Sequence, residues 1–171
     1  PNQRLRAAIA LSLLGKPQTE YLLNNIPTAP VAQCRNLIAA LSMEREATAL
    51  LQRRVQAFTA EPTPDREKKA RFAIVALYLG EPSLAIDMCS PRADLIQRTT
   101  FAERWSQWHG EWATLLKVVR NLKDEALLGT LLLGIGDVAP DELSPDVLAA
   151  WKTWLTNLHR ENSDPWVHSA C

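Results

Sequence analysis

The residues whose types could bind a metal ion lie near the C-terminal end of the chain. His159, Asp164, His168 and Cys171 carry the imidazole, carboxylate and thiol groups that zinc prefers. Only His168 and Cys171 are closely spaced, and no C-x-x-C pair accompanies them. We therefore expect no metal and no other cofactor here. Asp164 is interpreted instead as the N-cap of a helix, with His168 packed or solvated behind it.

A glycine pattern, GTLLLGIG, superficially resembles a phosphate-binding loop. It contains Gly129, Gly134 and Gly136. A phosphate loop needs a Lys followed by Ser or Thr after the last glycine, and a strand before the first, and this pattern has neither. We interpret the segment as a helix whose small residues allow a close contact with another helix.

The cysteines offer no evident nucleophile. Cys34 shares an apolar helix face with Val31 and Ile38, which indicates a core residue, while Cys89 follows Met88 and is expected to be partly exposed. Neither has a histidine nearby in the sequence, although the fold could still bring a histidine close to one of them in space. Three widely spaced cysteines form no disulfide framework, which favours a reducing cytoplasm. We expect no enzymatic activity.

The charge balance argues against a general nucleic-acid binder. Nineteen basic and nineteen acidic residues cancel, whereas nucleic-acid binding needs a basic excess. The basic group between Arg45 and Arg71 is interleaved with acidic residues, which is typical of a solvated helix face. No apolar run approaches the roughly 18 residues that cross a bilayer, so we expect no membrane partner.

Tryptophan is the residue type that hints at binding, because it is enriched at binding hot spots. All six tryptophans lie at or after Trp105. Phe101, Trp105, Trp108 and Trp112 share one helix face if the helix continues through Gly110. Most of the tryptophans are expected in the core, since aromatic side chains bury large areas, and the others are expected to line a groove. The candidate interaction surface consists of Trp105, Trp108, Trp112, Arg53 and Arg54.

The elements that would position these groups are all helices. Apolar residues recur with a 3.6-residue period, and no segment shows the sustained alternation of a strand. The strongest internal break is the EPTPD segment at 61–65, where Thr63 can cap the next helix and Pro64 fits its first turn. Pro30 also suits a first helical position. Helices are expected over 3–14, 19–24, 31–41, 47–58, 63–79, 84–88, from 91 onward, 111–121, 124–133 and from 144 onward.

Two of these helices share a phrase. RAAIALSLLGKP at 6–17 and RFAIVALYLGEP at 71–82 agree at six of twelve positions, with a weaker echo at 127–137. Gly15 and Gly80 should take the left-handed C′ conformation, and Ile9 and Ile74 should be buried. Such recurrence predicts an all-α, HEAT-like or armadillo-like repeat array of about nine to ten short helices, forming a single domain over 1–171. The repeat spacing is longer than the roughly 40–47 residues of a HEAT unit.

These phrases resemble the HEAT-like segments of large bacterial, particularly planctomycete, multidomain proteins. In those proteins a serine/threonine kinase is joined to a formylglycine-generating, sulfatase-modifying-factor-like domain. The SPRADLI stretch at 90–96 resembles the repeat start of that linker, and DPWVHSA at 164–170 is similar to the phrase D-P-x-[VI]-H-[SG]-A that closes it. The resemblance implies a piece of a longer chain. The chain contains no kinase motif, so neither catalytic activity is implied for any of its residues.

We therefore expect a non-catalytic scaffold or protein–protein interaction module within a larger bacterial signalling or regulatory protein. Its partner would be another protein or a neighbouring domain of the same chain. The alternative is a regulatory or ligand-sensing helical domain of an enzyme, with a cryptic Cys/His site. A deep pocket with converging polar groups and shifted pKa values would favour that alternative. A smooth concave face would favour the scaffold.

Overall fold

The computed structural model describes residues 2–60, 65–107, 110–136, 138 and 143–171. These residues form only helices and no strand, which confirms the all-α class for the part described. The elements are α1 (Asn2–Leu13), α2 (Thr19–Asn25), the 3₁₀ helices η1 (Ile26–Thr28) and η2 (Val31–Gln33), α3 (Cys34–Met43), α4 (Ala47–Ala60), α5 (Arg66–Tyr78), α6 (Ser83–Cys89), α7 (Leu95–Gln107), α8 (Trp112–Arg120), α9 (Glu125–Ile135), α10 (Pro145–Glu161) and α11 (Pro165–Ala170).

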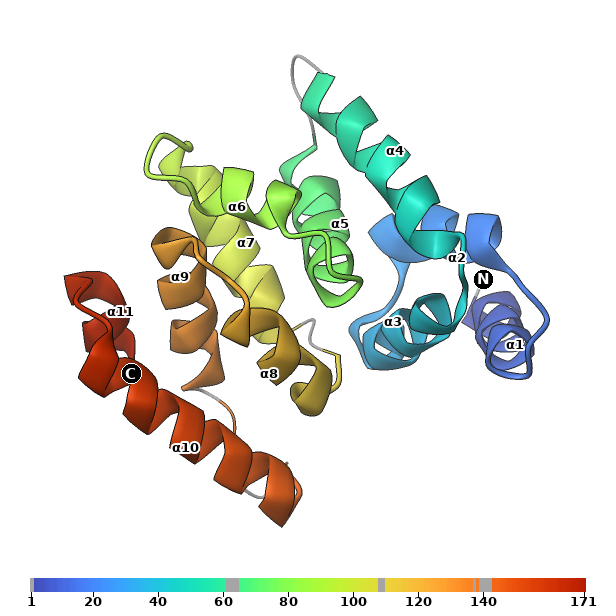
Figure 1. Ribbon diagram of the computed structural model, residues 1–171. Helices are drawn as coiled ribbons and strands as arrows, with labels where there is room; N and C mark the ends of the chain where they lie inside the picture. The colour runs from blue at the N-terminus through green and yellow to red at the C-terminus, as the bar shows by residue number, and fades with distance from the viewer. Residues whose placement is uncertain (1, 61–64, 108–109, 137, 139–142) are drawn as a thin grey trace.

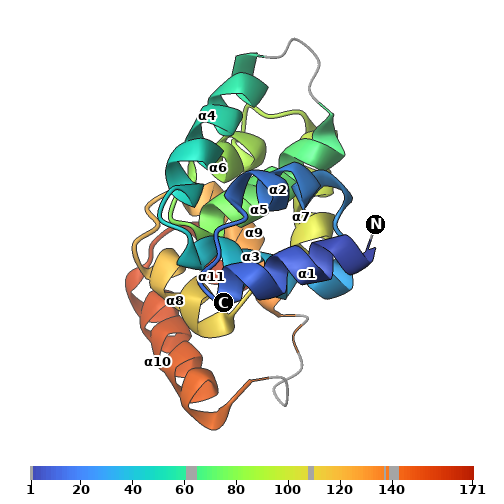
Figure 2. The same cartoon turned by 90° about the vertical axis from the view of Figure 1, so that its right-hand side faces the viewer.

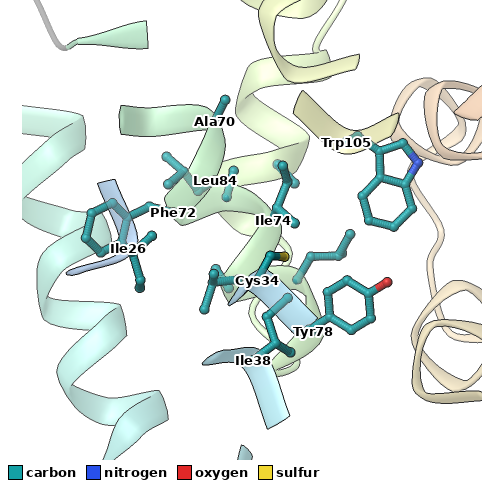
Figure 3. Packing of buried hydrophobic residues seen from close by; sticks show 14 of the residues in the cluster. Ile26, Cys34, Ile38, Ala70, Phe72, Ile74, Tyr78, Leu84 and Trp105 are labelled. Atoms are coloured by element: carbon teal, nitrogen blue, oxygen red, sulfur yellow. The ribbon is translucent and has the colours of Figure 1, made fainter. Parts of the chain in front are cut away.

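The helices follow one another across an elongated body. α1, α2 and α3 lie at one end, α10 and α11 lie at the other, and α5 runs through the middle (Figure 1). α5 contacts α6 and α7, which follow it, and also η1 and α4, which precede it. Every residue from Phe72 to Tyr78 is buried, so α5 is the central helix of the core. Figure 3 shows Ile26 and Cys34 packed beside α5 and Trp105 farther along the same cluster.

The two helices that share a phrase end in the same backbone motif. Gly15 has a φ of 77°, its N–H donates to the Ser12 carbonyl, and the Lys16 N–H reaches back to the Leu11 carbonyl. These two bonds define a Schellman C-cap. Gly80, with a φ of 84°, ends α5 with the same two bonds at the same offsets. The prediction of left-handed glycines at both helix ends is therefore confirmed, and so is the burial of Ile9 and Ile74.

The start of α5 differs from the expected one. Asp65 is its N-cap, because the Asp65 carboxylate accepts hydrogen bonds from the backbone N–H groups of Glu67 and Lys68. A carboxylate at this position also interacts favourably with the positive end of the helix dipole. The expected cap, Thr63, and the expected first-turn residue, Pro64, lie outside the described residues.

Two further helix starts were predicted wrongly. Pro30 has an extended ψ of 146° and precedes η2 instead of occupying a first helical position. α7 begins at Leu95, not near Pro91, because a turn fills the residues between them. The Asp94 side chain accepts the Ile96 N–H at 3.1 Å and so stabilises the actual start.

Candidate functional site

Two of the three tryptophans expected on an interaction surface are core residues. Trp105 is only 1% exposed, and its Nε1 donates a hydrogen bond to the Leu131 carbonyl of α9. Trp112 is buried against Trp151 of α10, with ring centroids 6.4 Å apart. Trp108 lies outside the described residues. The expectation that Trp105 and Trp112 face a partner is therefore corrected: α9 and α10 already cover them.

The two arginines of the candidate surface lie on α4. Arg53 is exposed, whereas Arg54 is half-buried and already paired. Its Nη2 lies 2.7 Å from Glu20 Oε2, and its Nη1 donates to Asn24 Oδ1 at 2.8 Å. Arg54 thus connects α4 to α2. Of the two arginines, only Arg53 is exposed.

Two further residues of this basic group, Lys69 and Arg71, also connect helices. Lys69 is buried, and its ammonium lies 2.6 Å from the Asp87 carboxylate of α6. Arg71 donates a hydrogen bond to the carbonyl of Pro27, within η1, at 2.6 Å. We expected a solvated helix face here, and that interpretation is wrong for these two residues. The alternation of basic and acidic residues in the sequence does not reveal that neighbouring helices cover α5 on both sides.

The glycines of α9 serve close packing. A Cβ atom on Gly134 would lie 2.5 Å from Cδ1 of Trp105, and a Cβ on Gly129 would lie 2.0 Å from Cδ1 and Nε1 of Trp166. The absence of side chains at these positions lets both indole rings approach the α9 backbone. The interpretation of GTLLLGIG as a helix with small residues at close contacts is confirmed, and no phosphate loop is formed there.

The candidate zinc ligands are brought together only in part. Asp164 is the N-cap of α11, as expected, and accepts the backbone N–H groups of Trp166 and Val167, each at 2.9 Å. The rings of His159 and His168 contact each other at a tilt of 37°, with centroids 3.8 Å apart. Within the described residues, no group of three or more His, Cys, Asp or Glu side chains is placed to hold a metal ion.

Both internal cysteines are buried thiols. Burial raises the pKa of Cys34 to about 12, and the nearby Arg71 offsets only part of this rise. Burial likewise raises the pKa of Cys89 to about 12, partly offset by a hydrogen bond with Thr130. A thiol with such a pKa is protonated at neutral pH and is a poor nucleophile. The core position of Cys34 is confirmed, and the expected partial exposure of Cys89 is wrong.

A cleft of about 340 Å³ opens between α6, α9 and α11. It contains charged groups of both signs, but its thiol is the protonated one of Cys89. The cleft is therefore large enough to bind a ligand, but its thiol is not activated for nucleophilic attack. It is lined by Cys89, Pro91, Arg98, Glu125, Ala126, Thr130, Asp164 and Trp166.

α1 has an uncovered apolar face. Its buried face, which includes Leu5 and Ile9, packs mainly on α2 and α3. On the opposite side, Ala7, Ala10, Leu11 and Leu14 are exposed in one row; Leu14 is 77% exposed. We name this row the α1 outer face. It lies at the end of the molecule that faces the viewer in Figure 2.

The corresponding face of α5 is covered. In the shared phrase, the outer-face positions of α1 match Phe72, Val75, Ala76 and Leu79. The first three are buried and Leu79 is half-buried. Phe72 packs on Phe58 of α4 with ring centroids 4.9 Å apart, and Figure 3 shows Ile26 of η1 beside it. Elements that precede α5 thus cover part of the α5 face that corresponds to the α1 outer face.

Comparison of the chain with models of known protein families, with curated protein sequences and with solved structures gave no match. The resemblance to HEAT-like segments of kinase and formylglycine-generating proteins stays a prediction. None of the helices in the described part is both long and apolar enough to cross a membrane.

Proposed function

We propose that this chain is a HEAT-like helical repeat that acts as a non-catalytic interaction module, and that a partner helix docks on the α1 outer face. The observation that carries the proposal is the exposure of this apolar row, whose counterpart on α5 is buried. The shared phrase and the matching Schellman caps of α1 and α5 support their equivalence. In a repeat array each unit covers its neighbour, so an apolar face that no described element covers is suited to bind another helix.

The charges around α1 favour one kind of occupant. Arg4, Arg6 and Lys16 are exposed, and residues 2–19 contain no acidic residue. Two copies of α1 packed against each other would bring these positive charges together. The complementary partner is an amphipathic helix with an apolar row and acidic residues at its ends. It could belong to another protein or, as the family resemblance implies, to a neighbouring domain.

The alternative of a cryptic Cys/His site has less support. The internal thiols are buried and have raised pKa values, so neither is poised to attack a substrate. The tilted pair of His159 and His168 rings joins α10 to α11 and is far in the sequence from both internal cysteines. Binding by surface complementarity is the function that the arrangement supports best.

A synthetic helical peptide tests the proposal. Its apolar row would match the α1 outer face in length and would be flanked by Glu; a second peptide would carry Lys at the same positions. We expect fluorescence anisotropy to detect binding of the Glu-flanked peptide, weaker binding at high salt, and little binding of the Lys-flanked one. Leu11→Asp and Leu14→Asp should abolish binding and leave the melting temperature nearly unchanged. Leu133→Asp, at an exposed leucine of α9, is the matched control.

Two outcomes would contradict this choice of partner. Equal binding of both peptides, or binding that persists in Leu14→Asp, would show that the α1 outer face is not the docking surface. A dimer of the chain that sedimentation detects and that Leu14→Asp dissociates would show that a second copy occupies the face.

A further inference from the structure

A buried carboxylate lies where α3 ends and α2 begins. Glu44 follows Met43, the last residue of α3, and is only 8% exposed. Its Oε1 accepts a hydrogen bond from the backbone N–H of Gln18, the residue before α2, at 2.7 Å. One oxygen of this side chain therefore has a structural role, because it joins two segments that are 26 residues apart.

The second oxygen of Glu44 has no such role. Its Oε2 is buried and has no hydrogen-bond partner among the described residues. A buried acceptor without a donor is costly, and a charged one is more so, because burial removes the water that would stabilise it. Buried polar groups in folded proteins are rarely left in this state, so a donor from outside the chain is the expected solution.

Glu44 lines a cavity that could admit such a donor. The cavity has a volume of about 380 Å³, within the range of ligand sites. Pro17 and Met43 supply apolar wall, and Met43 is 68% exposed at the rim. Glu46 contributes a second carboxylate and Arg45 the one cationic side chain among the lining residues. The complete lining is Ser12, Gly15, Pro17, Thr19, Met43, Glu44, Arg45 and Glu46.

One of the two hydroxyl groups in the cavity lining, that of Ser12, already has a partner. Ser12 Oγ donates to the Ala40 carbonyl of α3 at 3.2 Å, and this bond is buried. The one proton of that hydroxyl is therefore not available to Glu44.

We propose that this cavity binds a primary alkylammonium group, which donates a charge-assisted hydrogen bond to Oε2 of Glu44. A cation fits better than a neutral donor, because it also compensates the buried negative charge. A primary ammonium has three N–H donors, so it can bind Glu44 and still reach Glu46 or water. Its methylene chain packs along Pro17 and Met43.

The ammonium could come from a free aliphatic amine or from a lysine side chain of a bound protein. Only the second source rests on the proposed function, because it needs a partner at this end of the molecule. The cavity lies directly after α1, at Gly15 and Pro17, so a partner on the α1 outer face could reach it.

Methionine methyl NMR of the full chain tests the site directly. The chain has two methionines, Met43 at the cavity and Met88 in the core, so methyl labelling gives two signals and Met88 is an internal control. Met43→Leu identifies the Met43 signal. We expect n-butylammonium to shift the Met43 signal, with saturation in the millimolar range, and to leave the Met88 signal unchanged. n-Butanol, which has the same chain without the charge, should have little effect.

Variants then separate the two carboxylates. Glu44→Gln keeps the shape of the side chain and an acceptor for the Gln18 N–H, but it should weaken n-butylammonium binding by about tenfold or more, because the charged partner is lost. Glu46→Gln, which removes the carboxylate at an exposed position, should have a smaller effect. The melting temperature of Glu44→Gln should be at least that of the unaltered chain in the absence of amine, since an uncompensated buried charge is removed. This measurement shows that the variant is folded.

The remaining measurements identify the source of the ammonium group and define the results that would refute the site. Equal binding of n-butylammonium and a blocked lysine dipeptide indicates that the alkylammonium alone is recognised, and tighter binding of the peptide indicates a protein ligand. No shift of Met43 with either probe, an equal shift with n-butanol, or unchanged binding in Glu44→Gln would each refute the site. Leu14→Asp should leave n-butylammonium binding intact, so failure of the docking proposal and failure of the ammonium site are distinguishable.

Discussion

The indole ring of Trp166 occupies the space that a side chain at position 129 would need. A Cβ atom on Gly129 would lie 2.0 Å from both Cδ1 and Nε1 of the ring, far inside van der Waals contact. Gly129 is in the middle of α9 and Trp166 is in α11, so this pair sets how closely the two helices pack. Because Trp166 is half-exposed, its ring can move outward, but only if it leaves this contact.

Gly129→Ala should therefore destabilise the protein. We expect a loss of about 1–3 kcal/mol in the free energy of unfolding, the usual cost of overpacking a close contact. Alanine is the better helix former by about 0.5–1 kcal/mol, so the loss occurs against the intrinsic preference of α9. Urea unfolding of the two proteins measures the difference.

A second background isolates the cause. In a Trp166→Ala protein the ring is absent, and Gly129→Ala should then stabilise α9 by about 0.5–1 kcal/mol through helix propensity alone. A change of sign between the two backgrounds would assign the effect to the Trp166 contact. The same loss in both would show that the α9 backbone or another neighbour is responsible.

Local signals in the sequence predicted the local structure well. Gly15 and Gly80 were recognisable as helix ends because each follows an apolar period and precedes a proline by two residues. Asp164 was recognisable as an N-cap because it precedes Pro165 and a short apolar phrase. Each of these features depends on residues within one or two turns, so a single sequence contains the information.

The contacts that define the candidate sites could not be predicted in this way. Trp105 was assigned to a surface because helical spacing does not show whether α9 will cover it. Glu44 stands in an apparently solvated run, MEREA, and its burial depends on Gln18, which lies 26 residues earlier. The α1 outer face did have a signal, since Ala7, Ala10, Leu11 and Leu14 follow a helical period of their own. This second apolar row is hard to recognise in the sequence, because apolar residues of the buried face lie between its members.

The left-handed glycines offer a test of the shared helix end. Gly15→Ala and Gly80→Ala should each cost about 1–2 kcal/mol, because an L-residue with a Cβ is strained at positive φ. A Cβ atom would meet nothing within 4 Å at either position, so the cost is one of backbone conformation alone. Asparagine should be tolerated better than alanine at both. Thermal unfolding of the four variants provides the comparison.

Gly136 is the matched control for these substitutions. It follows the end of α9 with an ordinary helical φ of −59°. Gly136→Ala should therefore be close to neutral. If it cost as much as Gly15→Ala, loss of glycine flexibility in general, and not the left-handed conformation, would explain the effect.

The two matched isoleucines should differ in importance. Ile9 and Ile74 are both buried, so truncation of each to Ala should cost about 2–5 kcal/mol in free energy of unfolding. Ile74 belongs at the upper end of that range, because α5 is covered from both sides, and Ile9 at the lower end, because α1 is covered from one. Urea melts would rank them. A loss below about 0.5 kcal/mol at either site would be incompatible with a packed position.

A salt bridge between α5 and α7 should make a small, pH-dependent contribution to stability. Arg104 donates Nε to Glu67 Oε2 at 2.5 Å and Nη2 to Glu67 Oε1 at 3.0 Å. The hydrogen bonds from Arg104 hold the pKa of Glu67 below its ordinary value of 4.5, although partial burial acts in the opposite direction. Because the folded-state pKa is lowered, the stabilisation is fully present above about 4.5 and is lost as the pH falls through the folded-state value.

A double-mutant cycle with Glu67→Gln and Arg104→Gln measures this contribution. Half of the Glu67 side chain is exposed, so solvent screening limits the coupling free energy to about 0.2–1 kcal/mol near neutral pH. The coupling should approach zero once the pH falls below the lowered folded-state pKa of Glu67, because its carboxylate is then protonated in both the folded and the unfolded state. It should also decrease in concentrated salt. A coupling that stayed constant from neutral to acidic pH would mean that the two side chains stabilise the α5–α7 contact through packing of their methylene groups, not through their charges.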